Sequence, residues 1–157
     1  MNSPELLTRA ADAEVIAGGT ITLLGEAPIA GGDLAVNRAL LPEGYAGVPP
    51  HLHERTTECF FVLGGRLEAL AGERIVVLEE GDFLLVPAGT VHALAPAHGT
   101  HADFLSIATP TTERFAYYRL LDAVQRGDAQ PQELGATGPR FDNRFVESAA
   151  WAGRPAA

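Results

Sequence analysis

Two stretches decide the fold of this chain: GVPPHLHERTTECFFVLGG at residues 47–65 and GDFLLVPAGTVHALAP at residues 81–96. The first places two histidines and a glutamate close together, and the second places a histidine just after a Pro-Ala-Gly turn. These residues are His51, His53, Glu58 and His92. Imidazole nitrogens and a carboxylate in a strand-rich setting are natural ligands of a divalent metal. We therefore expect the four side chains to meet around one ion.

Alternation along the strands predicts which side chains face that ion. His51 and His53 stand two residues apart, so in an extended segment over residues 50–54 they point to the same side. In the run ECFFVL that follows, one alternate set shares a face: Glu58, Phe60 and Val62. Cys59 lies on the opposite face, and we interpret it as a small packing residue and not as a ligand.

The turn before His92 predicts how this histidine reaches the other three. Pro87 and Gly89 suit the second and fourth positions of a type I turn, which delivers His92 into a new strand. His92 then faces the interior from the opposite wall. Leu94 shares its face, so we expect Leu94, together with Phe60 and Val62, to line an apolar substrate pocket.

Between residues 20 and 108 the chain shows short apolar runs separated by glycine, proline and acidic residues. The predicted strands are Thr20–Leu24, Leu34–Leu41, Glu58–Leu63, Arg66–Ala71, Arg74–Leu78, Phe83–Val86, Val91–Ala95 and Asp103–Ala108. Many short strands at close spacing favour an antiparallel sandwich or barrel over a parallel sheet with crossover helices.

The two ends of the chain have a different pattern. Residues 1–17 are expected to form an arm, with a helix near residues 5–13, and residues 18–109 the β-barrel domain. Residues 110–157 are expected to form a helix and tail packed on the barrel, with a further helical turn at 131–134 and a frayed end.

The helix after the barrel is predicted from its caps and its periodicity. Thr111 or Thr112 is a plausible N-cap and Gly127 a plausible end. One helical face would carry Tyr117, Leu121 and Val124.

Composition limits the classes of partner. The chain has 157 residues, about one domain, with a net charge of −9 and a pI near 4.9. This acidity argues against binding to nucleic acid or to an anionic membrane surface. One cysteine permits no internal disulfide, and no secretory signal or long apolar run is present, so we expect a cytoplasmic protein. His98 and His101 are expected to be exposed and without a role.

The spacing H-x-H-x4-E-x6-G from His51 to Gly65, followed by G-x5-P-x-G-x2-H from Gly81 to His92, resembles the two signature motifs of the cupin superfamily. The resemblance implies an all-β fold, a small antiparallel β-barrel or jelly roll, with a C-terminal helical segment. With the segment ERFAYYRLLDAVQRG at residues 113–127, the chain is similar to bacterial quercetinase-like cupins, which are flavonol dioxygenases and their relatives.

This resemblance implies one divalent transition metal per chain (Fe, Ni, Mn, Co, Cu or Zn) held by His51, His53 and His92, with Glu58 as fourth ligand and as catalytic base. The implied activity is a metal-dependent dioxygenase that acts on a small aromatic or enolisable substrate with O2. Two alternatives stay open. One is a metal-dependent isomerase, lyase or decarboxylase, and the other is a non-catalytic small-molecule-binding barrel. ECFFVL is apolar on both faces, so its outer face should be covered by another strand layer, by the N-terminal arm or by a second subunit. A homodimer is expected, also from the resemblance.

Overall fold

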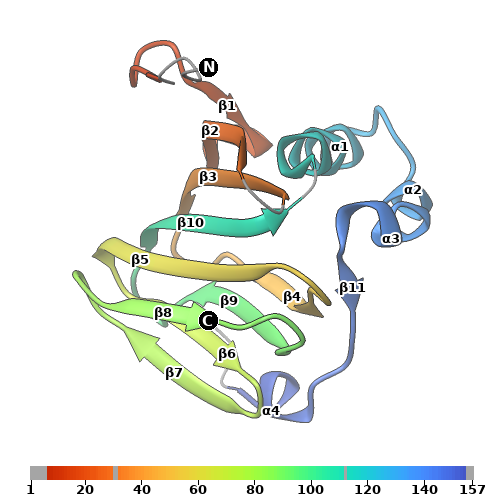
Figure 1. The fold of residues 1–157 in the computed structure, drawn as a ribbon. Helices are drawn as coiled ribbons and strands as arrows, with labels where there is room; N and C mark the ends of the chain where they lie inside the picture. Colours follow the sequence, from red (N-terminus) through yellow and green to blue (C-terminus); the bar gives the residue numbers. More distant parts are fainter. Residues whose placement is uncertain (1–6, 30–31, 112, 155–157) are drawn as a thin grey trace.

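Two antiparallel β-sheets face each other and enclose the core (Figure 1). The computed structural model describes residues 7–29, 32–111 and 113–154. The first sheet contains, in spatial order, β1 (Glu14–Ile16), β2 (Ile21–Ile29), β3 (Gly32–Leu41), β10 (Ala102–Thr111), β5 (Thr57–Gly65) and β8 (Phe83–Val86). The second contains β11 (Arg144–Phe145), β4 (Val48–Leu52), β9 (His92–Pro96), β6 (Leu67–Ala71) and β7 (Arg74–Leu78). The predicted all-β fold with a C-terminal helical segment is confirmed.

Each of the strands predicted from apolar runs overlaps a strand of the structure. The strands that the sequence missed are the short β1 and β11. The predicted extension over residues 50–54 is shifted, because β4 ends at Leu52 and His53 lies just beyond it. The pairing of β4 with β9, in which His51 is opposite His92, supplies the long-range contact that local sequence does not encode.

The alternation in β5 separates an interior face from an exterior face as predicted. Phe60 and Val62 are buried in the core, where they pack with residues from both sheets. The exterior face remains partly exposed on β5 and on its neighbour β8, where Phe83 and Leu85 are 56% and 52% exposed. From the sequence we expected another strand layer, the N-terminal arm or a second subunit to cover this face. Within residues 7–29, 32–111 and 113–154, Phe61 and Leu63 of β5 are each 37% exposed.

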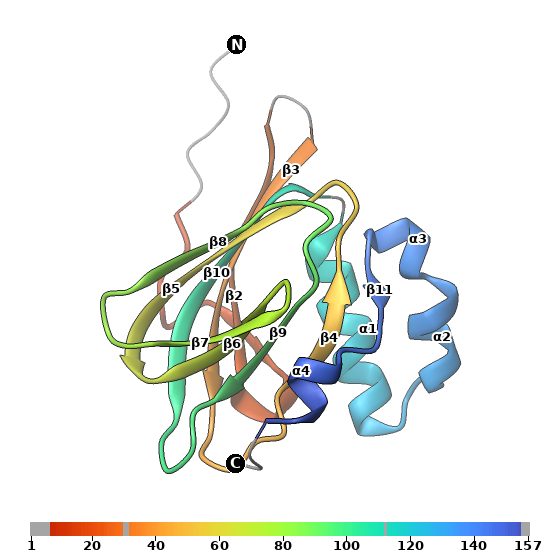
Figure 2. The same cartoon turned by 90° about the horizontal axis from the view of Figure 1, so that it is seen from below.

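After β10, the chain forms helices on one side of the barrel and then returns along the second sheet (Figure 2). The elements are α1 (Arg114–Arg126), α2 (Pro131–Ala136), α3 (Gly138–Phe141), β11 and α4 (Ala149–Ala152); the 3-10 turn η1 (Ala17–Gly19) lies near α1. Because β11 pairs with β4, the C-terminal segment becomes part of the sheet that carries His51.

The ends of α1 confirm one prediction and correct another. Gly127 is the C-cap, with φ +80°. The predicted N-cap was wrong for Thr111, because Thr111 is the last residue of β10; Thr112 lies outside the described residues. Glu113 stands at the N-cap in the left-handed region, and no side chain caps this helix end.

Three further expectations concern the termini. The helix expected near residues 5–13 is wrong for the described residues 7–13, which form a turn and irregular chain. The helical turn expected at residues 131–134 is confirmed as α2. The expected fraying of the end is wrong at Trp151, which is 6% exposed in α4 and packs with Leu70, Ala93 and Ala95.

Two glycines of the deciding stretches allow close approach of neighbouring backbone. Gly65 has φ +69°, and a Cβ there would lie 2.0 Å from the carbonyl oxygen of His101. Gly47 has φ +92°, and a Cβ would lie 2.4 Å from the carbonyl oxygen of Leu94. Any larger residue would therefore push β5 or β4 away from its neighbour. In the described part of the chain, no helix has the length and apolar character needed to cross a membrane.

Candidate metal centre

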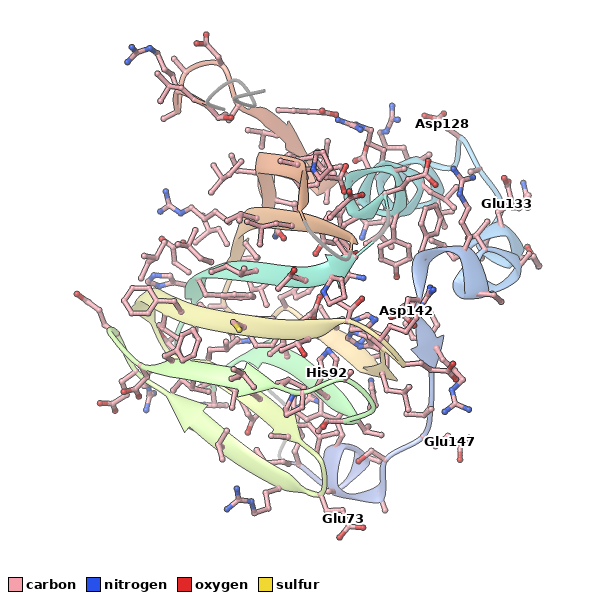
Figure 3. All side chains as sticks on the ribbon, viewed as in Figure 1. Glu73, His92, Asp128, Glu133, Asp142 and Glu147 are labelled. Atoms are coloured by element: carbon pink, nitrogen blue, oxygen red, sulfur yellow. The ribbon has the colours of Figure 1, made fainter. Side chains whose placement is uncertain are left out.

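The four predicted ligands come together in the interior of the barrel. His51 is on β4, His53 just after it, Glu58 on β5 and His92 on β9. Each is 5% exposed or less. One potential ligand atom from each residue lies within 4.8 Å of the others, so the cluster can hold one metal ion. Figure 3 labels His92 on the ribbon of the second sheet, facing the space between the sheets.

The three histidines are oriented by backbone carbonyls. His51 Nδ1 donates to Pro49 O at 2.8 Å, and His92 Nδ1 donates to Thr90 O at 2.9 Å. His53 Nδ1 donates to Asp142 O at 2.5 Å. With the proton on Nδ1, the lone pair of each ring is on Nε2. A donor set fixed in this way is typical of metal-ligating histidines, and the residues present fit a transition metal.

Asp142 supports the segment between His53 and Glu58. Its carboxylate accepts hydrogen bonds from the backbone N–H groups of Glu54, Arg55 and Thr56 at 2.9, 3.0 and 2.9 Å. It also accepts from Thr56 Oγ1 at 3.0 Å. Burial alone would raise the pKa of Asp142, but these hydrogen bonds keep it below its ordinary value. Asp142 precedes β11 in the C-terminal segment (Figure 3), so residues far from the metal motifs hold the connection between two ligands.

A buried cation, Arg114 at the start of α1, contacts the metal cluster. Its Nη2 donates to Glu58 Oε1 and lies 3.3 Å from His53 Nε2. The guanidinium carbon lies 5.5 Å from the ring centroid of Tyr117 and 5.3 Å from that of Tyr118. The helix therefore delivers a positive charge to the carboxylate of the ligand set.

The electrostatics keep Glu58 charged and His51 neutral. Burial alone would raise the pKa of Glu58, but the adjacent Arg114 guanidinium holds it well below its ordinary value. Burial and the neighbouring His92 lower the pKa of His51 to about 3. A carboxylate and a neutral imidazole are the protonation states that a metal ion binds.

A cavity of about 110 Å³ adjoins the ligands. Its wall includes His51 and Glu58 of the metal cluster, and its lining is mostly apolar. Of the predicted pocket residues, Phe60 and Leu94 line it. Val62 does not; it lies one alternate position further along β5 and packs in the core. Helix α1 closes one side with Arg114, Tyr117, Tyr118 and Leu121.

The turn before His92 differs in register from the prediction. The hydrogen bond runs from Thr90 N to Pro87 O, so Gly89 stands third in the turn, with φ +80°, as type II turns require. The type I assignment was therefore wrong. Gly89 N also donates to His53 O at 2.6 Å, which links this turn to the segment of another ligand.

The remaining sequence expectations on the cluster agree with the structure. Cys59 lies on the face of β5 opposite Glu58, outside the cluster, and is half-buried. His98 and His101 are exposed. Sequence reasoning missed Arg114 and Asp142, which lie in segments with no metal motif. The sequence signal for Arg114 was its position at the start of an amphipathic helix, but an arginine at such a position is commonly only a solvated charge.

Residues 37–108 match the family model described as "Cupin domain". The structure is similar to an RmlC-like cupin from Shewanella frigidimarina, with TM-score 0.59 and 22% identity over 73% of this chain and 99% of that one. It is also similar to KdgF from Halomonas sp., with TM-score 0.56 and 21% identity over 69% and 94% of the two chains. A protein from Klebsiella pneumoniae described as having a double-stranded β-helix domain gives TM-score 0.55 and 18% identity over 68% and 91%.

A comparison with curated proteins gave no match. The three similar structures share the fold at low identity, and none of them is named a quercetinase. The fold is thus that of a cupin, with two antiparallel sheets and a short C-terminal helical segment. The boundaries at residues 17 and 109 stay a prediction, as does the division of roles among the ligands.

Proposed function

We propose that this chain is a metal-dependent enzyme that adds O2 to a small aromatic or enolisable substrate. The observation that supports this most is a buried ligand set that opens onto an apolar cavity, since His51 and Glu58 belong to both. Ligands that also form a cavity wall leave a bound ion accessible to a small molecule, which a closed structural site does not do.

A divalent ion held by His51, His53, Glu58 and His92 would bind an oxygen atom of the substrate and would favour the reaction of the substrate with O2. Phe60, Leu94 and Phe104 would hold the apolar body of the substrate and exclude water. Glu58 is the candidate base, because its carboxylate borders both the cavity and the histidines, with Oε2 3.1 Å from His92 Nε2. Arg114 would stabilise the negative charge that forms when the substrate loses a proton.

A second candidate is an isomerase, lyase or decarboxylase that uses no O2. The observation that favours it is Arg114, because a buried cation beside Glu58 can stabilise an enolate without any electron transfer. An isomerase or lyase would begin, like the dioxygenase, with removal of a proton from the substrate, whereas a decarboxylase would form the enolate by loss of CO2. None of these three consumes O2, which separates them from the dioxygenase.

The test is oxygen uptake by protein loaded separately with Fe, Ni, Mn, Co, Cu or Zn, in the presence of flavonols and 1,3-diketones. Dioxygenation predicts uptake of one O2 per substrate lost with at least one metal. Loss of substrate without uptake supports the second candidate. If protein that is shown to hold its metal turns over no substrate, both enzymatic candidates are contradicted. The remaining alternative is then a non-catalytic binding protein. Glu58→Gln should lower turnover more than metal content if Glu58 is a base, whereas equal losses would make it a ligand only.

A further inference from the structure

The side chain of Arg114 has more hydrogen-bonding capacity than its neighbours use. It is 5% exposed. Its Nη2 pairs with Glu58, but Nε and Nη1 are buried and have no hydrogen-bond partner among the described residues. Leaving charged donors unpaired in the interior is costly, and in native structures a protein group, an ordered water or a ligand supplies the acceptor.

The charges of the site leave Arg114 short of a counter-ion once a metal is present. Glu58 is the only acidic residue among the described residues that line the cavity. A divalent ion on the histidines would share that single carboxylate with the guanidinium. The contact of Arg114 Nη2 with His53 Nε2 at 3.3 Å would also be lost, because one lone pair cannot serve both a proton donor and a metal. A second anion is needed to balance the buried positive charge.

The surroundings of Arg114 indicate where this anion lies. The two tyrosine rings, with centroids 5.5 and 5.3 Å from the guanidinium carbon, limit the positions that the side chain can take. The cavity wall also includes Asn37 and Ser106, partners in the pairing of β3 with β10, and both are 5% exposed or less. These two polar groups can bind a hydroxyl or keto oxygen, and the rest of the wall suits an apolar body.

We infer that the ligand of this cavity is a small carboxylate, bound with its carboxylate group against Arg114 and its apolar part against the barrel wall. The inference rests on the proposed metal-dependent function and narrows its substrate class. Arg114 in this scheme contacts the substrate directly and is more than the ion-pair partner of Glu58.

The experiment is isothermal titration calorimetry on zinc-loaded protein with two matched pairs of probes: benzoate against benzamide, and hexanoate against hexanamide. Each pair has nearly the same shape and differs in charge. Wild-type protein should bind at least one carboxylate about 10- to 100-fold more tightly than its amide, the range expected for a charge-assisted hydrogen bond in a buried site. Arg114→Gln should abolish this preference, and Arg114→Lys should keep part of it.

The control variant is Arg119→Gln on the same helix, since Arg119 is exposed and pairs with Glu14 on the surface. It should leave the preference unchanged. Zinc content and thermal unfolding are measured for every variant. If Arg114→Gln fails to fold, the carboxylate preference of Arg114→Lys is compared with that of wild type instead. Equal binding of acid and amide by zinc-loaded wild type, or binding of neither, would overturn the inference. So would a carboxylate preference that persists in folded, zinc-loaded Arg114→Gln, because the metal alone would then hold the anion.

This result is separate from oxygen uptake. Protein that binds benzoate or hexanoate through Arg114 and consumes no O2 would retain the carboxylate inference and contradict the dioxygenase. Oxygen uptake with neutral substrates, together with no preference for carboxylates in calorimetry, would support the dioxygenase and contradict the carboxylate inference.

Discussion

Removing the Asp142 carboxylate should both destabilise the fold and weaken metal binding. The carboxylate accepts four hydrogen bonds from the segment Glu54–Thr56, which joins His53 to Glu58. A hydrogen bond to a charged group contributes about 1.5–3 kcal/mol, but water can replace some of these bonds because Glu54 and Arg55 are exposed. We therefore expect Asp142→Ala to lower the free energy of unfolding by about 3 kcal/mol and Asp142→Asn by about 1–2 kcal/mol.

The effect on the metal follows from the same contact. The backbone carbonyl of Asp142 fixes the His53 ring through Nδ1 at 2.5 Å, so release of this segment frees a ligand to rotate. Loss of such a supporting contact typically lowers metal affinity by about 10- to 100-fold. The measurements are urea unfolding of metal-free protein and zinc affinity by competition with a chromophoric chelator. Asp128→Asn is the matched control, because Asp128 lies on the surface and pairs with exposed Arg126.

The pH dependence gives an independent check. The pKa of Asp142 is lowered in the folded protein, so its contribution to stability is present above the pKa of the unfolded chain, about 3.9, and is lost as pH falls toward the folded value. The difference in stability between wild type and Asp142→Asn should therefore shrink below about pH 4. If Asp142→Ala unfolds at the wild-type urea concentration and binds zinc as tightly as wild type, the proposed support of His53 is refuted.

Three further predictions concern the ligands, the close approaches and the outer face. His92→Ala should lose most of the bound metal in elemental analysis, and exposed His98→Ala should keep it; equal contents would remove His92 from the ligand set. Gly89→Ala should cost about 1 kcal/mol in urea unfolding from its positive φ alone, since a Cβ there meets nothing within 4 Å. Gly65→Ala adds a clash with backbone and should cost clearly more, so equal costs would contradict the close approach. If the expected homodimer uses the exposed apolar face of β5 and β8, Leu85→Asp should convert it to a monomer in light scattering, and a wild-type monomer would contradict the homodimer itself.

The sequence predicted that the four candidate ligands would meet, because the constraint on them is local and periodic. His51 and His53 stand two residues apart beside a proline pair, and Glu58 is the second residue of a strand whose alternation fixes the direction of its side chain. The fourth candidate ligand, His92, was placed by the glycine turn before it, and the error in turn type did not change the strand that followed. A short spacing rule of this kind still places the side chains correctly when a predicted strand boundary is wrong by one residue.

The residues that contact the candidate ligands from outside the cluster could not be predicted in the same way. Arg114 lies 56 residues after Glu58, and Asp142 lies 89 residues after His53, so no spacing rule links them. In the sequence each looks like an ordinary surface charge. Their burial depends on α1 covering the cavity and on β11 pairing with β4, and both contacts are properties of the folded chain.

The metal ligands and the residues that surround them thus come from different parts of the chain. All four candidate ligands lie within residues 37–108, the stretch that matches the cupin domain, whereas Arg114, Tyr117, Tyr118 and Asp142 follow it. The barrel fixes the ligand atoms through strand pairing, which tolerates little change without loss of the fold. The C-terminal segment is joined to the barrel by β11, by the Asp142 hydrogen bonds and by the packing of Trp151. Substitutions of Tyr117 or Tyr118 on α1 should change the shape of the cavity while the four candidate ligands stay in place, so we expect substrate selectivity to depend more on α1 than on the candidate ligands.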